Sequence, residues 1–275
     1  MKEIGVEEFR PLLLTMLQDV HAFCGQHGIR YSLNYGTLIG ALRHGGFIPW
    51  DDDIDIIMPR QDYERFVRTF SAPGLGIISE KDPDYYLNYC RVFDTVKTGC
   101  KTILPVGKDY TGGVWIDVFP ADGVSDDFEA FGGNVARYKK IWVLQLRYRY
   151  AQASLKDIFR TCGIKDLCIL LAIKLSGQGR KRLDAINAQV RENACRIPYG
   201  SSLHWSQLEV LDDGVRNYQL CEDFEETIDA PFEGHTFKIM KGYDRVLRNI
   251  YGDYMQLPPE NQRQPKHGHV TLYWK

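Results

Sequence analysis

The sequence predicts an α+β fold in which a mixed β-sheet core is flanked by helices. Over residues 1–125, short apolar runs of strand length alternate with segments of helical periodicity. Residues 126–200 hold long helical segments and few strand candidates, so we expect a helical insertion there. Residues 201–275 are expected to complete the core as a largely helical C-terminal part. A chain of 275 residues suits one compact unit with these three parts.

The elements of the first part follow from periodicity and from the glycines and prolines between them. Apolar residues three and four apart predict the first helix, which Gly28 is placed to end. Gly45 and Gly46 break the next helix, and Pro59 closes the strand that follows. Pro120 is expected to stop the last strand in the same way. In chain order, we expect a helix over 7–27, a strand over 31–35, a helix over 37–44, a strand over 54–58, a helix over 60–70, and strands over 75–79, 89–96 and 114–119.

The remaining elements are mostly helical. We expect helices over 131–149, 155–175 and 181–194, a strand over 237–240 and a last helix over 243–251. The tail from Leu257 is rich in Pro, Gln and Lys and is expected to be irregular. The apolar run LCILLAIKL, residues 167–175, allows either a membrane-surface stripe or a helix buried within the protein. We favour the buried helix.

The charge and cysteine content exclude several classes of protein. A formal net charge of -2 lacks the basic excess of nucleic-acid-binding proteins, so no nucleic-acid partner is expected. The seven cysteines include no CxxC pair, which argues against a zinc module and a disulfide scaffold. His267 and His269 form an HxH pair without a third ligand nearby, so we expect no metal there. With no signal-peptide pattern and no apolar run of membrane-spanning length, we expect a cytoplasmic protein.

Four aspartates crowd into residues 51–55, with apolar residues on both sides. One interpretation is a solvated acidic turn, because aspartates also cluster at turns and helix starts. A calcium loop of the EF-hand type is excluded locally, because Ile56 stands where that loop needs glycine. In a strand, Asp53 and Asp55 point to one face while the isoleucines point into the core. Two such carboxylates can share one or two divalent cations.

A third aspartate has the same setting. Asp117 stands in the run WIDVF, between apolar residues of a predicted strand. An aspartate buried in this way is costly unless it is paired, hydrogen-bonded or bound to metal. With Asp53 and Asp55 it would supply hard oxygen ligands, which suit Mg²⁺ or Mn²⁺ and leave positions for water and substrate phosphate.

Gly36 and Thr37 stand at a junction between a predicted strand and a predicted helix. Such a junction presents free backbone N–H groups and the positive end of the helix dipole, which together favour phosphate. Taken alone, a Gly-Thr pair is more often a helix cap than a phosphate site, so both interpretations stay open.

In combination, these features resemble the nucleotidyltransferase superfamily, whose layout is a Gly-Thr helix start, a DxD strand and a later strand aspartate. The longer motifs resemble the LicD family of phosphotransferases, which shares its core with fukutin-related proteins. The motifs that carry the resemblance lie toward both ends of the chain: YGTLIGALRHGGFIPWDDDIDI, the R-x-D-Y-E-x-F pattern of RQDYERF, IDVFP, FEG and YDRVLRNIYGDYMQLPP. The helical middle of the chain matches none of them, so we expect specificity for the acceptor to reside there.

The resemblance implies an enzyme that transfers a phospho-substituent, such as phosphocholine, from a CDP-linked donor to a hydroxyl of a glycan. The acceptor would be a teichoic acid or lipopolysaccharide precursor. By this resemblance, Asp53, Asp55 and Asp117 hold Mg²⁺ or Mn²⁺ against the donor pyrophosphate. Asp117 is also a candidate to accept the proton of the attacking hydroxyl. A lipid-linked acceptor would bring the protein into peripheral contact with the inner face of the membrane.

The resemblance also implies a set of donor-phosphate residues, namely Gly36, Thr37, Arg43 and His44. For Arg43 a surface salt bridge is an equal alternative, and His44 suits a local hydrogen bond better than the role of a base. Arg91 is a further cation that could reach phosphate, although charges at sheet edges are usually solvated.

Two other functions fit the same residues. A nucleotidyltransferase would use the three aspartates to attach NMP from an NTP to a small phosphorylated alcohol. A non-catalytic nucleotide- or glycan-binding protein would keep the fold, but it would not need all three carboxylates. The sequence does not identify the transferred group, because the aromatic residues that could enclose a quaternary ammonium suit the core equally well.

Overall fold

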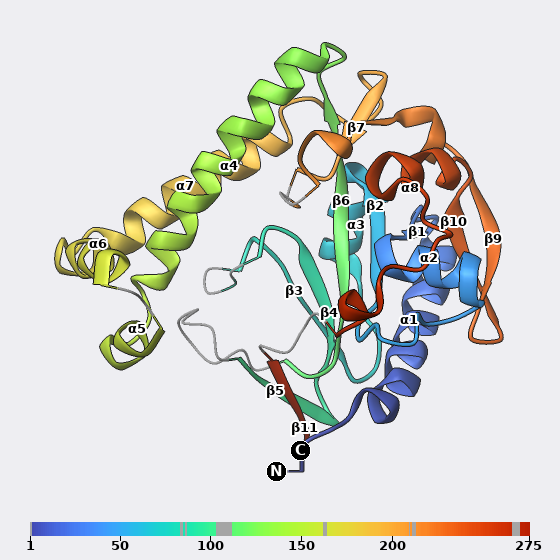
Figure 1. Cartoon of the computed structure of the whole chain (residues 1–275), viewed down its shortest axis with the longest axis horizontal. Helices are drawn as coiled ribbons and strands as arrows, with labels where there is room; N and C mark the ends of the chain where they lie inside the picture. The colour runs from blue at the N-terminus through green and yellow to red at the C-terminus, as the bar shows by residue number, and fades with distance from the viewer. Residues whose placement is uncertain are drawn as a thin grey trace.

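The computed structural model has an α+β fold, as the sequence predicts (Figure 1). It describes residues 2–82, 85, 87–102, 112–161, 164–208, 210, 213–265 and 270–275. His267 and His269 lie outside the described residues.

A mixed sheet forms the centre of the molecule, in the strand order β1-β2-β6-β4-β3. Strands β2 and β6 run parallel, whereas the other neighbours in this order are antiparallel. Strand β7 pairs with the far end of β6, and β8 pairs with β7. The strands are β1 (Ser32–Leu33), β2 (Asp55–Pro59), β3 (Leu75–Ile78), β4 (Cys90–Asp94), β6 (Trp115–Val124), β7 (His204–Ser206) and β8 (Gln219–Leu220).

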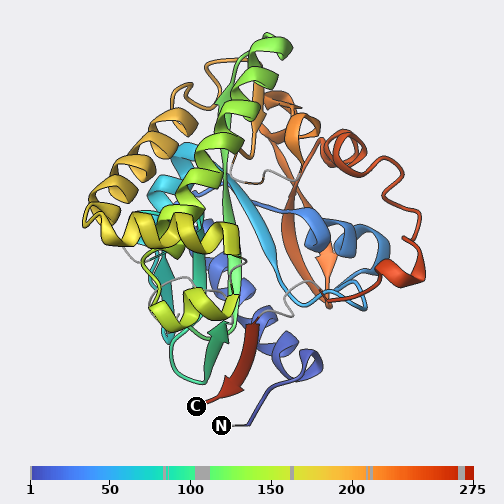
Figure 2. The same cartoon turned by 60° about the vertical axis from the view of Figure 1, so that its left-hand side comes forward.

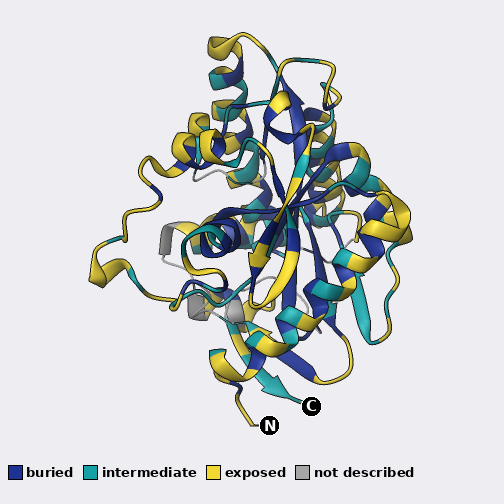
Figure 3. Ribbon diagram, turned by 90° about the vertical axis from the view of Figure 1, so that its right-hand side faces the viewer, coloured by how far each residue is buried: buried dark blue, intermediate teal, exposed yellow. Residues whose placement is uncertain are grey.

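Helices α1 (Val6–His27) and α3 (Arg60–Thr69) pack on one face of this sheet. Their apolar stripes meet the alternate side chains of β2 and β6, in the largest buried cluster of the described chain. Figure 3 shows the strands buried in the middle of the molecule and the outer faces of the helices exposed. As predicted, α1 ends at Gly28, whose φ of 59° is the left-handed conformation that glycine favours.

The helical insertion extends away from the sheet as α4 (Phe128–Tyr150), α5 (Leu155–Thr161), α6 (Ile164–Leu175) and α7 (Gly179–Ala194) (Figures 1 and 2). Helix α4 begins earlier than predicted because the Asp127 carboxylate accepts hydrogen bonds from the N–H groups of Glu129 and Ala130. The structure has two helices where one was expected over 155–175. No helix in the described part of the chain is both long and apolar enough to cross a bilayer.

The C-terminal part returns to the core. The hairpin of β9 (Thr227–Phe232) and β10 (His235–Met240) lies beside β1, where the Met240 N–H donates to Ser32 Oγ at 2.9 Å. Helix α8 (Tyr243–Tyr251) matches its predicted bounds. Short 3-10 turns follow or precede these elements, at Gly214–Arg216, Cys221–Phe224 and Glu260–Gln262.

The expectation of an irregular tail is wrong for the end of the chain. Strand β11 (Val270–Trp274) pairs along its whole length with β5 (Thr98–Thr102), which the sequence pattern did not reveal. The Ile4 N–H also donates to the carbonyl of Leu272, so both ends of the chain lie together at the edge of the core (Figure 1). The division of the chain into three parts remains a prediction.

The prediction that Pro120 stops its strand is also wrong. Strand β6 continues through Pro120, which lies opposite Met58 of β2. On the other side of β6, pairing with β4 ends at Val118 and pairing with β7 begins at Asp122. Pro120 therefore occupies the interval between two partners, where a backbone N–H is not needed for the ladder on that side.

The turn of the β9–β10 hairpin fixes the end of α2 (Tyr35–His44). Glu233 and Gly234 both have positive φ, which suits a tight hairpin turn. The Glu233 carboxylate accepts from the Phe47 N–H at 2.9 Å, and the Glu233 N–H donates to the carbonyl of Gly45. A Cβ at Gly46 would lie 2.1 Å from that carboxylate, so the second glycine makes room for the turn.

A buried ion pair joins the start of α3 to β6. Arg60 donates from Nε and Nη2 to the two oxygens of Asp122, at 2.6 and 2.7 Å. The Asp122 side chain is almost completely buried, and the Arg60 side chain is only 10% exposed. Removing one partner of such a pair leaves a desolvated charge behind.

We predict that Asp122→Ala lowers the free energy of unfolding by about 3 kcal/mol, because Arg60 then loses its closest counter-charge. Urea denaturation measures the change. The matched control is Asp229→Ala, which breaks an exposed pair with Lys238 and should change stability little. Equal losses in the two variants would contradict the prediction.

Candidate active site

Three carboxylates meet where strands β2 and β6 begin. Asp53 lies just before β2, Asp55 is its first residue, and Asp117 is the third residue of β6. Asp55 lies directly opposite Asp117 in the parallel ladder. One oxygen from each of Asp53, Asp55 and Asp117 lies within 4.8 Å of the others. The structure thus brings together the three aspartates that the sequence nominated.

The alternation expected for this segment is present. Ile54 and Ile56 are fully buried, whereas Asp53 and Asp55 are half-buried. The carbonyl of Ile54 accepts the Asp117 N–H at 2.9 Å, so the segment before β2 already follows the course of the strand. Burial of the isoleucines therefore turns both carboxylates to the same side.

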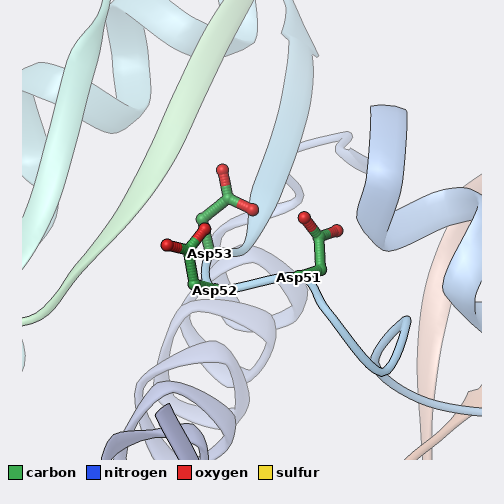
Figure 4. Close-up of side chains that lie close together, drawn as sticks. All are labelled: Asp51, Asp52 and Asp53. Atoms are coloured by element: carbon green, nitrogen blue, oxygen red, sulfur yellow. The ribbon is translucent and has the colours of Figure 1, made fainter. Parts of the chain in front are cut away.

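Asp51 and Asp52 extend the acidic group. Their carboxylates and that of Asp53 form a second cluster within 4.8 Å, at the point where the chain enters β2 (Figure 4). Arg10 fixes this segment from α1, since its Nη2 donates to the carbonyls of Ile48, Pro49 and Asp51 at 2.6 to 3.0 Å. So many carboxylates in one place repel one another unless cations compensate them.

The start of α2 lies against this acidic group. Gly36 is in the first turn, and a Cβ there would lie 2.3 Å from Oδ2 of Asp51. The Thr37 hydroxyl accepts a hydrogen bond from the Asp55 N–H at 2.9 Å. Gly36 therefore gives Asp51 room, and Thr37 positions the first residue of β2. The positive end of the α2 dipole faces the same region.

Arg43 and His44 lie at the other end of α2. At a rise of 1.5 Å per residue, Arg43 is about 10 Å along the axis from Gly36. Its Nη1 donates to the carbonyl of Tyr254 at 2.8 Å, and its Nε donates to Nε2 of His44 at 3.0 Å. Burial and the adjacent Arg43 lower the pKa of His44. These hydrogen bonds tie Arg43 to the segment after α8. A role in phosphate binding remains a prediction.

The sequence allowed Arg91 to be a solvated charge at the edge of a sheet, but the structure buries it. It is buried on β4 directly opposite Asp117, and its Nε donates to Oδ1 of Asp117 at 2.5 Å. The guanidinium lies over the ring of Trp115, 4.3 Å from the centroid. Trp115 Nε1 donates to the other oxygen of Asp117 at 3.3 Å. Asp117 is thus held in a fixed orientation by two neighbours.

Tyr251, the last residue of α8, adds a hydroxyl to the site. Its pKa is raised by burial of the hydroxyl and then by four neighbouring aspartates, in decreasing order Asp213, Asp55, Asp51 and Asp53. A tyrosine hydroxyl is protonated at neutral pH, so Tyr251 places a potential hydrogen-bond donor near the carboxylates. The sequence places Tyr251 at the end of the last predicted helix, and only the docking of α8 shows that it lies near the aspartates.

Comparisons with known proteins, by family and by individual relatives, agree with one another. Residues 28–149 match the family described as LicD/FKTN/FKRP, nucleotidyltransferase domain. The chain is 30% identical over 274 residues to the lipopolysaccharide cholinephosphotransferase LicD of Haemophilus influenzae, with 97% of each chain covered. It is 37% identical over 54 residues to the ribitol 5-phosphate transferase FKRP of Homo sapiens, covering 20% of this chain and 11% of that protein.

The mixed sheet and these matches define a phosphotransferase that is built around a nucleotidyltransferase domain. The match over nearly the whole length of the bacterial relative identifies the family to which this phosphotransferase belongs. The chain belongs to the LicD family and is a LicD-like phosphotransferase.

We predict that Gly36→Ala lowers the affinity for Mn²⁺ about tenfold, because the new Cβ displaces the Asp51 carboxylate beside the metal-ligand candidates. Isothermal titration with Mn²⁺ measures the effect. Gly25→Ala is the matched control, since it also lies in a helix and its Cβ would meet no atom within 4 Å. Unchanged affinity in Gly36→Ala would show that the position of Asp51 does not matter for the site.

Proposed function

We propose that this protein is a metal-dependent transferase that moves a phospho-substituent, such as phosphocholine, from a CDP-linked donor to a hydroxyl of a cell-surface glycan. The observation that carries the proposal is the cluster of Asp53, Asp55 and Asp117, with oxygens within 4.8 Å of one another. The relative from Haemophilus influenzae is named for choline phosphate transfer to lipopolysaccharide, which supports this class of substituent and acceptor.

The donor set fits Mg²⁺ or Mn²⁺. All three groups are carboxylates, and hard oxygen ligands of this kind suit small divalent cations. Asp53 and Asp55 are half-buried, so their side chains remain partly accessible to solvent. A cation bound there would neutralise the charge of the donor pyrophosphate and of the departing CMP.

The residues around the carboxylates have separate tasks in this proposal. Gly36 and Thr37 place the start of α2, with its positive dipole end, beside the donor phosphates. Arg91 keeps the Asp117 carboxylate in a fixed orientation, because its Nε donates to Oδ1 at 2.5 Å. We assign Asp117 to metal binding rather than to proton abstraction, because one of its oxygens lies within 4.8 Å of oxygens of Asp53 and Asp55 and its carboxylate is already held by Arg91.

We predict that Asp53→Ala and Asp55→Ala abolish turnover while leaving the fold intact. Thermal unfolding of the wild type with a panel of CDP-linked donors should show a shift that needs Mg²⁺ or Mn²⁺ and disappears with EDTA. Both variants should lose that shift. Asp19→Ala, on the exposed side of α1, is the matched control and should keep it.

The donor panel also separates the proposed function from its rivals. A shift that depends on the group attached to CDP supports the transferase and nominates the transferred group. A metal-dependent shift with NTP alone would favour a nucleotidyltransferase. Retained turnover in Asp53→Ala or Asp55→Ala would overturn the metal-site assignment.

We predict that Asp117→Asn lowers kcat and metal affinity together, because the amide is a poorer ligand and its NH₂ group repels the donors of Arg91. Steady-state kinetics at varied Mn²⁺ concentration distinguish the two roles. A large loss of kcat with unchanged metal and donor affinity would instead make Asp117 the base that accepts the acceptor proton.

A further inference from the structure

The outer end of the helical insertion is strongly basic within an acidic chain. Residues 139–182 contain eleven Lys and Arg but only two Asp, whereas the whole chain has a formal net charge of -2. This segment covers the second half of α4, all of α5 and α6, and the start of α7. We call it the basic tip. Such a local excess of positive charge attracts anionic surfaces.

Helix α6 is apolar nearly all round and yet lies at the surface. Nine of its twelve residues are apolar, in the sequence IKDLCILLAIKL. A helix of this composition is normally buried in a globular protein. Leu170 is buried, but Leu175 is 84% exposed and Ile169 is 37% exposed. The expectation of a helix buried within the protein is therefore wrong for this face.

The exposed residues of α6 share one side of the helix. Cys168, Ile169, Ala172 and Leu175 are all exposed and recur at steps of three and four residues. Helix α5 adds Leu155 and Phe159, which are also exposed and four residues apart. The two helices lie side by side at the outer edge of the insertion (Figure 2).

The basic tip is anchored to the rest of the insertion. Lys174 Nζ donates to the carbonyls of Ala151 and Ala153, at 3.2 and 2.6 Å, and so holds α6 against the end of α4. Ile158 and Leu170 pack into the small cluster beneath the two helices. The exposed apolar residues therefore belong to helices that are packed against the rest of the insertion.

We propose that α5 and α6 form a docking surface for an anionic phospholipid bilayer. Exposed apolar side chains on a helical surface with basic residues around them are the features of helices that lie in a membrane interface. Lys156 on α5 and Lys181 at the start of α7 are exposed and belong to the same basic tip. The basic charge favours an anionic bilayer over a second copy of the chain, because pairing the same face of two copies would bring like charges together.

This inference goes beyond the proposed function and does not depend on it. It rests on the charge and exposure of the insertion, not on the aspartate cluster. If both hold, docking would raise the local concentration of a lipid-linked acceptor around the enzyme.

The test is co-sedimentation of the full-length protein with vesicles. Vesicles of phosphatidylcholine with added phosphatidylglycerol should bind the protein, and vesicles of phosphatidylcholine alone should bind it weakly. Binding should fall as NaCl is raised, because salt screens the attraction to the anionic surface. Absence of binding to the anionic vesicles at low salt would overturn the proposal.

Two double variants and a matched control locate the surface. Lys156→Gln with Lys181→Gln should weaken binding about 30-fold, at about 1 kcal/mol for each basic residue. Phe159→Ser with Leu175→Ser should weaken it at least as much, since the removed side chains no longer enter the interface. The control combines Val96→Ser with Lys97→Gln on the β4–β5 turn, where Val96 is 62% exposed, and should bind as the wild type does.

Three further results would contradict the proposal. One is unchanged vesicle binding in both double variants when circular dichroism shows an intact fold. Another is an equal loss of binding in the control. The third is a concentration-dependent dimer, seen by analytical ultracentrifugation, that Leu175→Ser abolishes while vesicle binding persists, because it would assign the face to a second copy of the chain.

Discussion

The parallel pairing of β2 with β6 is the constraint on which the candidate site depends. It sets Asp55 opposite Asp117, although 61 residues separate them in the chain. Side chains alternate along a strand, so a slip of one residue in this ladder would turn Asp117 to the opposite face. The register is held by what each strand buries, since Ile56 and Val118 pack beneath α1 and α3 while the carboxylates face the other way.

The same arrangement concentrates negative charge, and much of the surrounding structure compensates for it. Arg91 pairs with Asp117 from the neighbouring strand, and the first turn of α2 points its positive end toward the other carboxylates. Gly36 allows the close approach of Asp51, and Tyr251 adds a protonated hydroxyl. These contacts orient the carboxylates of the proposed cation site.

Charge is divided between the two parts of the molecule. The core carries the acidic cluster, and the basic tip lies at the outer end of the insertion. In our proposals the two surfaces have different partners: a cation with a phosphorylated donor at the sheet, and an anionic lipid surface at α5 and α6. The family match over residues 28–149 takes in most of α4, the first helix of the insertion.

The sequence by itself determined what depends on neighbours along the chain. Periodicity and capping residues placed α1, α3 and α8, and alternation predicted that Asp53 and Asp55 share a face. Only the tertiary structure decided what depends on partners far away. The pairing of β5 with β11, the passage of β6 through Pro120, the burial of Arg91 against Asp117 and the exposure of α6 all arise from contacts between distant segments. Local pattern carries no record of which strand or surface a residue will meet.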